Sequence, residues 1–275
     1  MTLIAVKLLL APSFVVGASL ASRRFGVRVG GLIAGLPVVA GPILLVYALE
    51  HGRLFAADAA AGTLLGLVSL IAFVVVYGRL AGRASWRVCL LAGWLAFALG
   101  TVVFYEVSIP TGAALALVGV AILVGLAALP RPGSEVCAHP SPPPWDLPMR
   151  AVCALALVLT LTAVAGWLGP HLSGLLTPFP VMATVLATFT HAQRGTDELL
   201  RLLRGLISGF GAFALFCFTL SISLRTLDIA SSFALATVLA LLTQSATLAI
   251  TRGERASEAL PASAASPAAD VLPEY

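Results

Sequence analysis

Prolines and glycines interrupt two apolar stretches of the sequence, and they are the residues best suited to binding a ligand. A proline inside a helix removes one backbone hydrogen bond, and in lipid the freed carbonyl needs a partner in the protein or in a water-filled cavity. A break of this kind presents backbone N–H and C=O groups to a ligand, although the same residues also form ordinary kinks and packing notches in transmembrane helices. The candidate substrate-binding residues in these stretches are Gly35, Pro37, Gly41, Pro42, Thr177, Pro178 and Pro180.

Two polar residues in otherwise apolar segments complete the candidate site. Thr101 and Gln244 are 143 positions apart, and Gln244 is flanked by Thr243 and Ser245. We expect both to face a central cavity together with the broken helices. The alternative role is hydrogen bonding between helices, which is worth about 0.6 kcal/mol for each residue.

The sequence has no pattern typical of an enzyme or a metal site. HExxH, GxSxG, Walker A and aspartate-rich diphosphate motifs are absent, and the four cysteines form no CxxC pair. No carboxylate lies near the middle of an apolar segment, where a proton or sodium carrier often keeps one. We therefore expect no enzymatic activity, no cofactor and no bound metal. The arginines are spread over short loops and form no patch, so we expect no nucleic-acid partner.

The composition is that of an integral membrane protein. Hydrophobic residues make up 60% of the 275 residues, charged residues make up only 10%, and the mean hydropathy is +1.04. Apolar runs recur at about 20 residues, the length of a bilayer-spanning helix. The expected fold class is all-α, with about nine transmembrane helices. The expected spans are 2–21, 29–49, 58–78, 88–106, 111–130, 149–168, 172–191, 205–224 and 229–250.

The distribution of arginine predicts the orientation of the chain. With nine spans, thirteen arginines fall in the loops and tail on one side, whereas only Arg53 and Arg225 fall on the other. Arginine-rich loops are typical of the cytoplasmic side. We expect a multi-pass protein of the bacterial inner membrane, with the N-terminus outside and the C-terminus in the cytoplasm.

The chain also contains an internal repeat. Shifted by 143 positions, residues 26–73 match residues 169–216 at ten of 48 positions, where roughly four are expected by chance, and Pro37 matches Pro180. The odd number of spans between equivalent points makes this an inverted-topology repeat of four helices. The expected organisation is a first repeat with connector span 5 (1–130), a proline-rich cytoplasmic linker (131–148), a second repeat (149–252) and a disordered cytoplasmic tail (253–275).

The broken segments at residues 30–44 and 174–183 carry a loose resemblance to known proteins. The chain resembles inverted-repeat permeases of the bile-acid/AbrB/LrgB carrier type, which implies broken helices that cross at the centre of each half. It departs from them in having nine expected spans and in lacking their polar cation-site residues. It also resembles a family of bacterial multi-pass inner-membrane proteins with a Gly-Leu-Pro-Val core, and this resemblance implies no activity.

Inverted repeats with broken helices are typical of secondary transporters. The first hypothesis is a transporter or exporter of a small molecule, with alternating access around the two broken helices. Sparse charge in the spans favours an apolar or weakly polar substrate, or an anion held by helix N-termini. The alternatives are a lipid or lipid-linked-precursor translocase and a non-transporting membrane scaffold subunit. Expected partners are membrane lipid and the small-molecule substrate, and a second copy of the chain, in a homodimer, is a further candidate partner.

Overall fold

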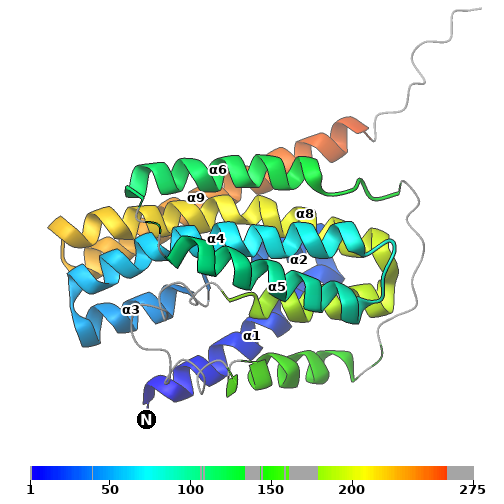
Figure 1. The fold of residues 1–275 in the computed structure, drawn as a ribbon, viewed down its shortest axis with the longest axis horizontal. Helices are drawn as coiled ribbons and strands as arrows, with labels where there is room; N and C mark the ends of the chain where they lie inside the picture. Colours follow the sequence, from blue (N-terminus) through cyan, green and yellow to red (C-terminus); the bar gives the residue numbers. More distant parts are fainter. Residues whose placement is uncertain are drawn as a thin grey trace, which may run out of the picture.

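The computed structural model describes residues 2–38, 40–105, 107, 109–133, 143, 145–157, 159–160 and 179–258. Every regular element in these residues is a helix, as the composition predicts (Figure 1). Residues 146–157 are also helical. The other helices are α1 (Thr2–Phe25), α2 (Val27–Ala34), α3 (Ala40–His51), α4 (Arg53–Leu80), α5 (Trp86–Tyr105), α6 (Thr111–Ala128), α8 (Val181–Thr226) and α9 (Ile229–Glu258).

Five helices of the described chain are long and apolar enough to cross a membrane. They are α4, α5, α6, α8 and residues Ile229–Ile250 of α9, which is consistent with a membrane protein. These helices contain all of the expected spans 58–78, 205–224 and 229–250. Helix α6 covers residues 111–128 of the expected span 111–130, and α5 covers most of 88–106. The expected span 29–49 is divided between α2 and α3. Residues 158 and 161–168 of the expected span 149–168, and residues 172–178 of the expected span 172–191, lie outside the described residues.

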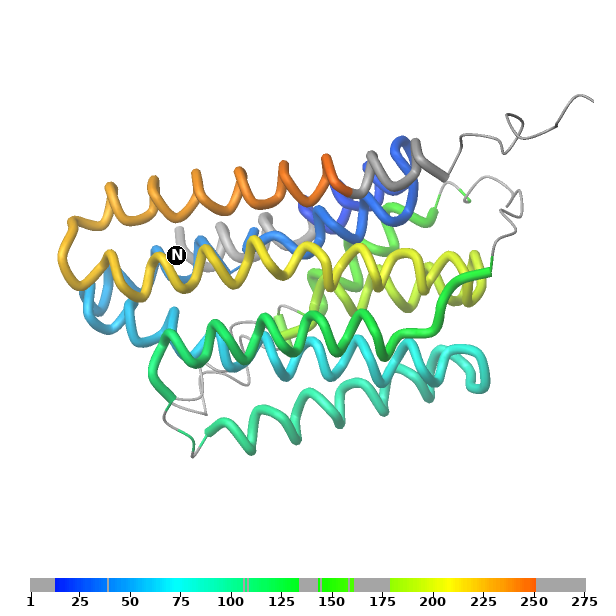
Figure 2. The backbone as a smooth tube through the Cα atoms, turned by 90° about the horizontal axis from the view of Figure 1, so that it is seen from above, coloured from blue at the N-terminus to red at the C-terminus, as the bar shows by residue number. Residues whose placement is uncertain are grey.

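Helices α4 and α8 form the centre of the bundle, and α5, α6 and α9 lie outside them (Figures 1 and 2). The most apolar windows of α4 and α8 are 61% and 67% buried, against 17–22% for the three outer helices. In α5 the exposed residues Val88, Leu91, Leu95, Leu99 and Val102 recur every three or four positions, so they form one apolar face. Such a face is suited to contact with lipid chains.

The central pair is antiparallel and is tied at both ends by hydrogen bonds. Helix α8 consists of two segments, residues 181–194 and 196–226, because Gly195 has a non-helical backbone. At one end of the second segment, the Thr196 hydroxyl donates to the Ala81 carbonyl over 3.1 Å. At the other end, Arg53 donates to the Leu227 carbonyl over 2.8 Å. The start of the second segment therefore lies beside the end of α4.

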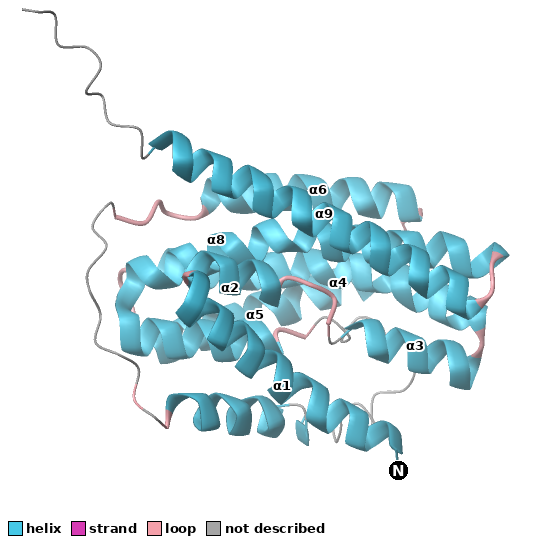
Figure 3. Ribbon diagram, turned by 180° about the vertical axis from the view of Figure 1, so that it is seen from behind, coloured by secondary structure: helices cyan, strands magenta, loops and turns pink. Residues whose placement is uncertain are grey.

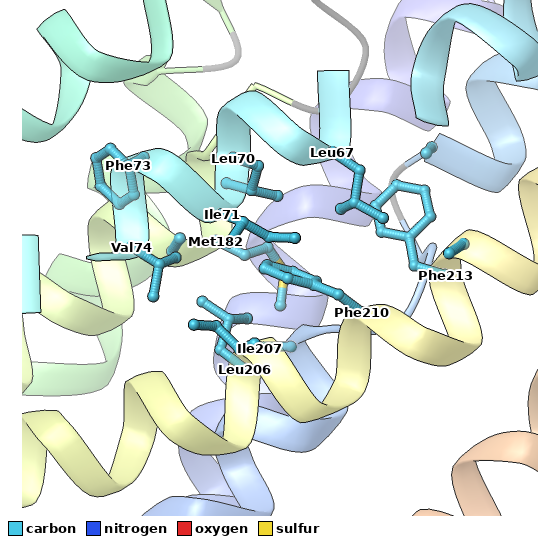
Figure 4. Close-up of a cluster of buried hydrophobic side chains, with 14 of the residues drawn as sticks. Leu67, Leu70, Ile71, Phe73, Val74, Met182, Leu206, Ile207, Phe210 and Phe213 are labelled. Carbon is cyan, nitrogen blue, oxygen red and sulfur yellow. The ribbon is translucent and has the colours of Figure 1, made fainter. Parts of the chain in front are cut away.

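Large apolar side chains fill the contact between α4 and α8 (Figure 4). Leu67 and Leu70 of α4 lie beside Phe210 and Phe213 of α8, and all four are at most 6% exposed. Their burial removes a large apolar area from the surface of both helices, and a well-packed interior of this kind resists rearrangement. The centre of the protein at this level is a packed core.

Arginines bind the exposed carbonyls at one end of the bundle, which we call the arginine end. The last carbonyls of a helix have no partner within the helix. Arg79 donates to the Ala128 carbonyl of α6 over 2.9 Å, and Arg204 donates to the Leu129 carbonyl over 3.1 Å. The α4–α5 turn and the end of α6 lie at this end, whereas the α3–α4 and α8–α9 turns lie at the opposite end (Figures 1 and 2).

Helix α2 crosses the second segment of α8 at the distance of backbone contact. Gly31 and Gly35 of α2 face Gly205 and Gly209 of α8, and each pair is spaced as Gly-x-x-x-Gly. A Cβ atom on Gly31 would collide with the Leu202 carbonyl oxygen, and one on Gly35 would lie 2.8 Å from the Gly209 Cα. Small residues at this spacing permit such close crossings in membranes. The four glycines hold the end of α2 against the central helix.

Single glycines make three of the turns between helices. Gly26, Gly52 and Gly195 have φ values of 94°, 90° and 78°, with ψ values of 155°, 166° and −175°. This region of the backbone map is essentially restricted to glycine. Gly52 joins α3 to α4, and Gly195 joins the two segments of α8, so each of these turns needs only one residue.

We expect Gly195→Ala to lower the free energy of unfolding by about 1–3 kcal/mol, because a Cβ atom strains this backbone conformation. The measurement is unfolding of the purified chain in a mild detergent. The matched control is Gly211→Ala in the same helix, where a Cβ atom would meet nothing within 4 Å and alanine favours the helix. Equal stability of the two variants would contradict the turn at Gly195.

Candidate functional site

The first helix break lies at Pro37, as the sequence predicts. Helix α2 ends at Ala34 and α3 begins at Ala40, and Figure 3 shows the non-helical segment between them. Two short hydrogen bonds shape this segment. The Val38 N–H donates to the Leu36 carbonyl over 2.8 Å, and the Gly41 N–H donates to the Pro37 carbonyl over 2.7 Å. The first bond closes a γ-turn around the proline.

The residues at the start of α8, which we call the second break, have the same pair of hydrogen bonds. The Val181 N–H donates to the Phe179 carbonyl over 2.7 Å, and the Thr184 N–H donates to the Pro180 carbonyl over 2.7 Å. Each donor and acceptor lies 143 positions after its counterpart in the first break. Pro180 directly precedes α8 and has φ −73° and ψ 45°, close to the centre of an inverse γ-turn. Thr177 and Pro178 lie outside the described residues.

The remaining residues of the first break have different surroundings. Gly35 is one of the four glycines at the contact between α2 and α8, which we call the glycine crossing. Its N–H donates to the Gly31 carbonyl over 3.0 Å. A Cβ atom on Gly41 would lie 3.5 Å from the ring of Phe216, which is an ordinary contact. Pro42 lies in the first turn of α3, where a helix accepts proline because the N–H there needs no helical partner. Pro37 therefore makes the break, whereas Pro42 belongs to the first turn of the next helix.

A cavity of about 50 Å³ lies between the two breaks, halfway along α4 and α8. Such a volume holds a few water molecules, whereas binding sites for organic ligands usually measure about 300–1,000 Å³. Every described side chain that lines it is apolar, so none of these residues offers a group for acid–base or nucleophilic chemistry. The lining residues are Ala34, Leu36, Ala40, Leu70, Phe179, Pro180, Val181, Met182, Ala183, Leu206, Phe210 and Phe213.

Gln244 contacts the first break directly. Its side-chain N–H donates over 2.8 Å to the carbonyl of Leu32, in the last turn of α2. The residue is only 4% exposed, and its side-chain oxygen has no hydrogen-bond partner among the described residues. Because α2 ends two residues later, its last carbonyls need partners from outside the helix. The Leu32 carbonyl accepts from the Gly35 N–H over 3.2 Å, and Gln244 of α9 supplies its second donor.

Thr101 does not contact the first break. Its hydroxyl donates over 2.9 Å to the carbonyl of Phe97, four residues earlier in α5. The ring of Phe97 lies 5.5 Å from that of Phe179 in the second break, and Trp94 of α5 donates to the Thr184 hydroxyl over 3.0 Å. Helix α5 therefore supports the second break, and Thr101 lies one turn from the residue that makes the contact.

A buried ion cluster at the arginine end is the main feature that the sequence analysis missed. Asp146 is 1% exposed and accepts hydrogen bonds from Arg23 over 2.7 Å, from Arg150 over 2.9 Å and from Gln193 over 2.7 Å. Burial raises the pKa of Asp146, but these hydrogen bonds and the charge of Arg150 outweigh it, so the pKa lies below its usual value. The only local signal was the i,i+4 spacing of Asp146 and Arg150.

We expect Gln244→Leu to lower the free energy of unfolding by about 1 kcal/mol, because it leaves the Leu32 carbonyl without this donor. Thr101→Val is the comparison variant, since the Thr101 hydroxyl bonds only within its own helix. Its expected effect is below about 0.5 kcal/mol. Detergent unfolding measures both, and a larger loss in Thr101→Val would contradict the role of Gln244 at the break.

We expect Asp146→Asn to cost about 3–5 kcal/mol at pH 7, because the buried Arg150 loses its charge partner. The folded pKa of Asp146 is lowered, so its contribution to stability is present above the ordinary aspartate value of about 3.9 and is lost as the pH falls below it. The difference between wild type and Asp146→Asn in unfolding experiments should therefore shrink below about pH 4. A difference that is constant down to pH 3 would contradict this assignment.

The control for this variant is Asp58→Asn at the opposite end. Asp58 also pairs with an arginine, Arg225, over 2.5 Å, but both side chains are largely exposed. Exposed ion pairs contribute less than about 1 kcal/mol. A loss at Asp58 as large as that at Asp146 would show that burial is not the reason for the effect.

The candidate site thus consists of the similar turns at Pro37 and Pro180 and an apolar cavity between them, and neither Thr101 nor Gln244 is among the described residues that line this cavity. Comparison of the chain with protein-family models, with curated proteins and with solved structures gave no match.

Proposed function

We propose that this chain is a secondary transporter of a small apolar or weakly polar molecule, with alternating access to the cavity between the two breaks. The observation that carries the proposal is the composition of the cavity wall. Three pairs of lining residues are each 143 positions apart: Leu36 and Phe179, Ala40 and Ala183, and Leu70 and Phe213. A pseudo-two-fold axis through the cavity accounts for this pairing, and transporters bind substrate at such an axis.

An internal duplication is supported by features outside the cavity. Gly52 and Gly195 make the same kind of turn, and α5 and α9 begin at residues 86 and 229, again 143 positions apart. The equivalent helices α4 and 196–226 run antiparallel, as inverted copies would. In this proposal spans 1–4 and 6–9 form the two repeats, and α6 is the connector.

The apolar wall limits the substrate class. A charged substrate would lose its hydration in this cavity without gaining a partner from the lining side chains. The small volume of the cavity fits a conformation in which it is closed to both sides of the membrane. Substrate binding therefore requires the two repeats to move apart. The arginine end is the cytoplasmic side in this proposal, in keeping with the distribution of positive charge.

A membrane scaffold without transport is the second candidate, and one observation favours it. Leucine and phenylalanine side chains fill the contact between α4 and α8 (Figure 4). A scaffold needs no path across this core. A lipid translocase would instead require the cavity to open sideways between the helices.

Cysteine accessibility separates these candidates without knowledge of the substrate. On a background without the native cysteines, Ala40→Cys and Ala183→Cys each place a thiol on the cavity wall, one from each proposed repeat. Right-side-out and inverted membrane vesicles are treated with a membrane-impermeant thiol reagent. For a transporter, we expect both positions to react from both sides, because each conformation opens the cavity to one side.

Three further positions make the result interpretable. Ser85→Cys, at the arginine end, should react only in inverted vesicles, and Ala230→Cys, at the opposite end, only in right-side-out vesicles. Ala236→Cys, which is fully buried away from the cavity, should not react. Cavity thiols that react from one side only, or not at all, would contradict alternating access and favour the scaffold. Reaction with a bilayer-soluble reagent alone would favour the lipid translocase.

A further inference from the structure

A second, smaller cavity adjoins the buried ion cluster at the arginine end. Its volume of about 10 Å³ is about that needed to hold one water molecule or one oxygen atom of a ligand. It lies where the end of α1, the first residues of the helix at 146–157 and the first segment of α8 come together. The polar residues that line it are Ser19, Ser22, Arg23, Asp146, Arg150, Thr190 and Arg194.

The charges around this cavity are not balanced. Among the residues that the structure describes, three arginines and one aspartate line it, which gives a formal charge of +2. The Asp146 carboxylate already accepts hydrogen bonds from Arg23, Arg150 and Gln193, and Arg150 is only 5% exposed. Arginines that line one small cavity repel one another, and burial of Arg150 adds to this cost, so an additional anion would be favourable. This imbalance favours a bound anion.

Ser19 supplies a donor that is directed at the same place. Its side chain is 2% exposed and lines the cavity, and its hydroxyl has no hydrogen-bond partner among the described residues. Buried hydroxyls in proteins are nearly always hydrogen-bonded, because leaving one unpaired is unfavourable. The hydroxyls of Ser22 and Thr190 lie on the same wall. An oxygen atom in the cavity would accept from Ser19 and from the guanidinium groups.

We propose that this cavity is the inner end of a binding site for a phosphate-class oxyanion, whose one oxygen enters between Ser19 and the arginines. Guanidinium groups match the oxygens of phosphate in pairs, and Arg23 and Arg194 are partly exposed, so they can hold the outer oxygens. Inorganic phosphate and the phosphodiester of an anionic phospholipid present the same oxygens. The site is separate from the apolar cavity and does not depend on the transport proposal.

The test uses the purified full-length chain in a neutral detergent. Its thermal unfolding is followed during titration with inorganic phosphate, and in parallel with phosphatidylglycerol added to the micelles. Titrations with chloride at the same ionic strength and with phosphatidylcholine are the controls. A ligand that binds only the folded state raises the unfolding temperature by mass action. We expect a saturable rise with phosphate, with phosphatidylglycerol or with both, which identifies the source of the oxyanion.

Variants locate the effect at the cavity. Ser19→Ala and Arg194→Gln should each weaken the apparent affinity for the stabilising ligand by about tenfold, which corresponds to about 1.4 kcal/mol. Ser19→Ala removes only a hydroxyl, so it tests the site even if loss of an arginine prevents folding. The matched control is Arg83→Gln, an exposed arginine at the same end that does not line the cavity. It should bind as the wild type does.

Three outcomes would overturn the proposal. The first is the absence of stabilisation by either phosphate or phosphatidylglycerol. The second is equal stabilisation by chloride, which would show only screening of the arginines. The third is an unchanged affinity in both Ser19→Ala and Arg194→Gln, which would place the binding elsewhere.

Discussion

Backbone contact between α2 and the second segment of α8 is the constraint on which the site depends. Gly31, Gly35, Gly205 and Gly209 bring two helices so close that a single methyl group would collide with the opposite backbone. The contact holds the end of α2 against α8, and so it fixes where in the bundle the break at Pro37 lies. Without it, the carbonyl of Leu32 would not lie within reach of Gln244, and the cavity would lose one wall.

The turns at Pro37 and Pro180 have the same local structure, and a neighbouring helix supports each of them. The end of a helix leaves backbone groups without partners, and lipid supplies none. Part of this demand is met locally, by the hydrogen bonds of the two γ-turns. Gln244 of α9 serves the first break, whereas α5 packs its aromatic rings against the second. The breaks are therefore stable features of the fold, and the outer helices maintain them.

Much of the helical framework could be predicted from the sequence, because apolar length and glycine or proline punctuation are local signals. The break at Pro37 and the internal position of Gln244 follow from this kind of information. The pairing of Asp146 with Arg23 could not be predicted, since the two residues are 123 positions apart and each resembles an ordinary loop charge. The glycine crossing was also missed, because sequence alone does not reveal which helix faces Gly31. The volume of the cavity depends on how all these side chains pack.

The one-residue turn at Gly52 has a consequence for how the chain enters a membrane. Helix α3 has 12 residues and is therefore about 18 Å long, well short of the roughly 30 Å thickness of the hydrocarbon layer. Helix α3 is too short to cross the hydrocarbon layer by itself. Because only one residue joins it to α4, it cannot stay outside the membrane while α4 inserts. We infer that α3 and α4 are inserted together as a helical hairpin, with the short arm held by the long one. The same reasoning applies to residues 181–194 and the segment that follows Gly195.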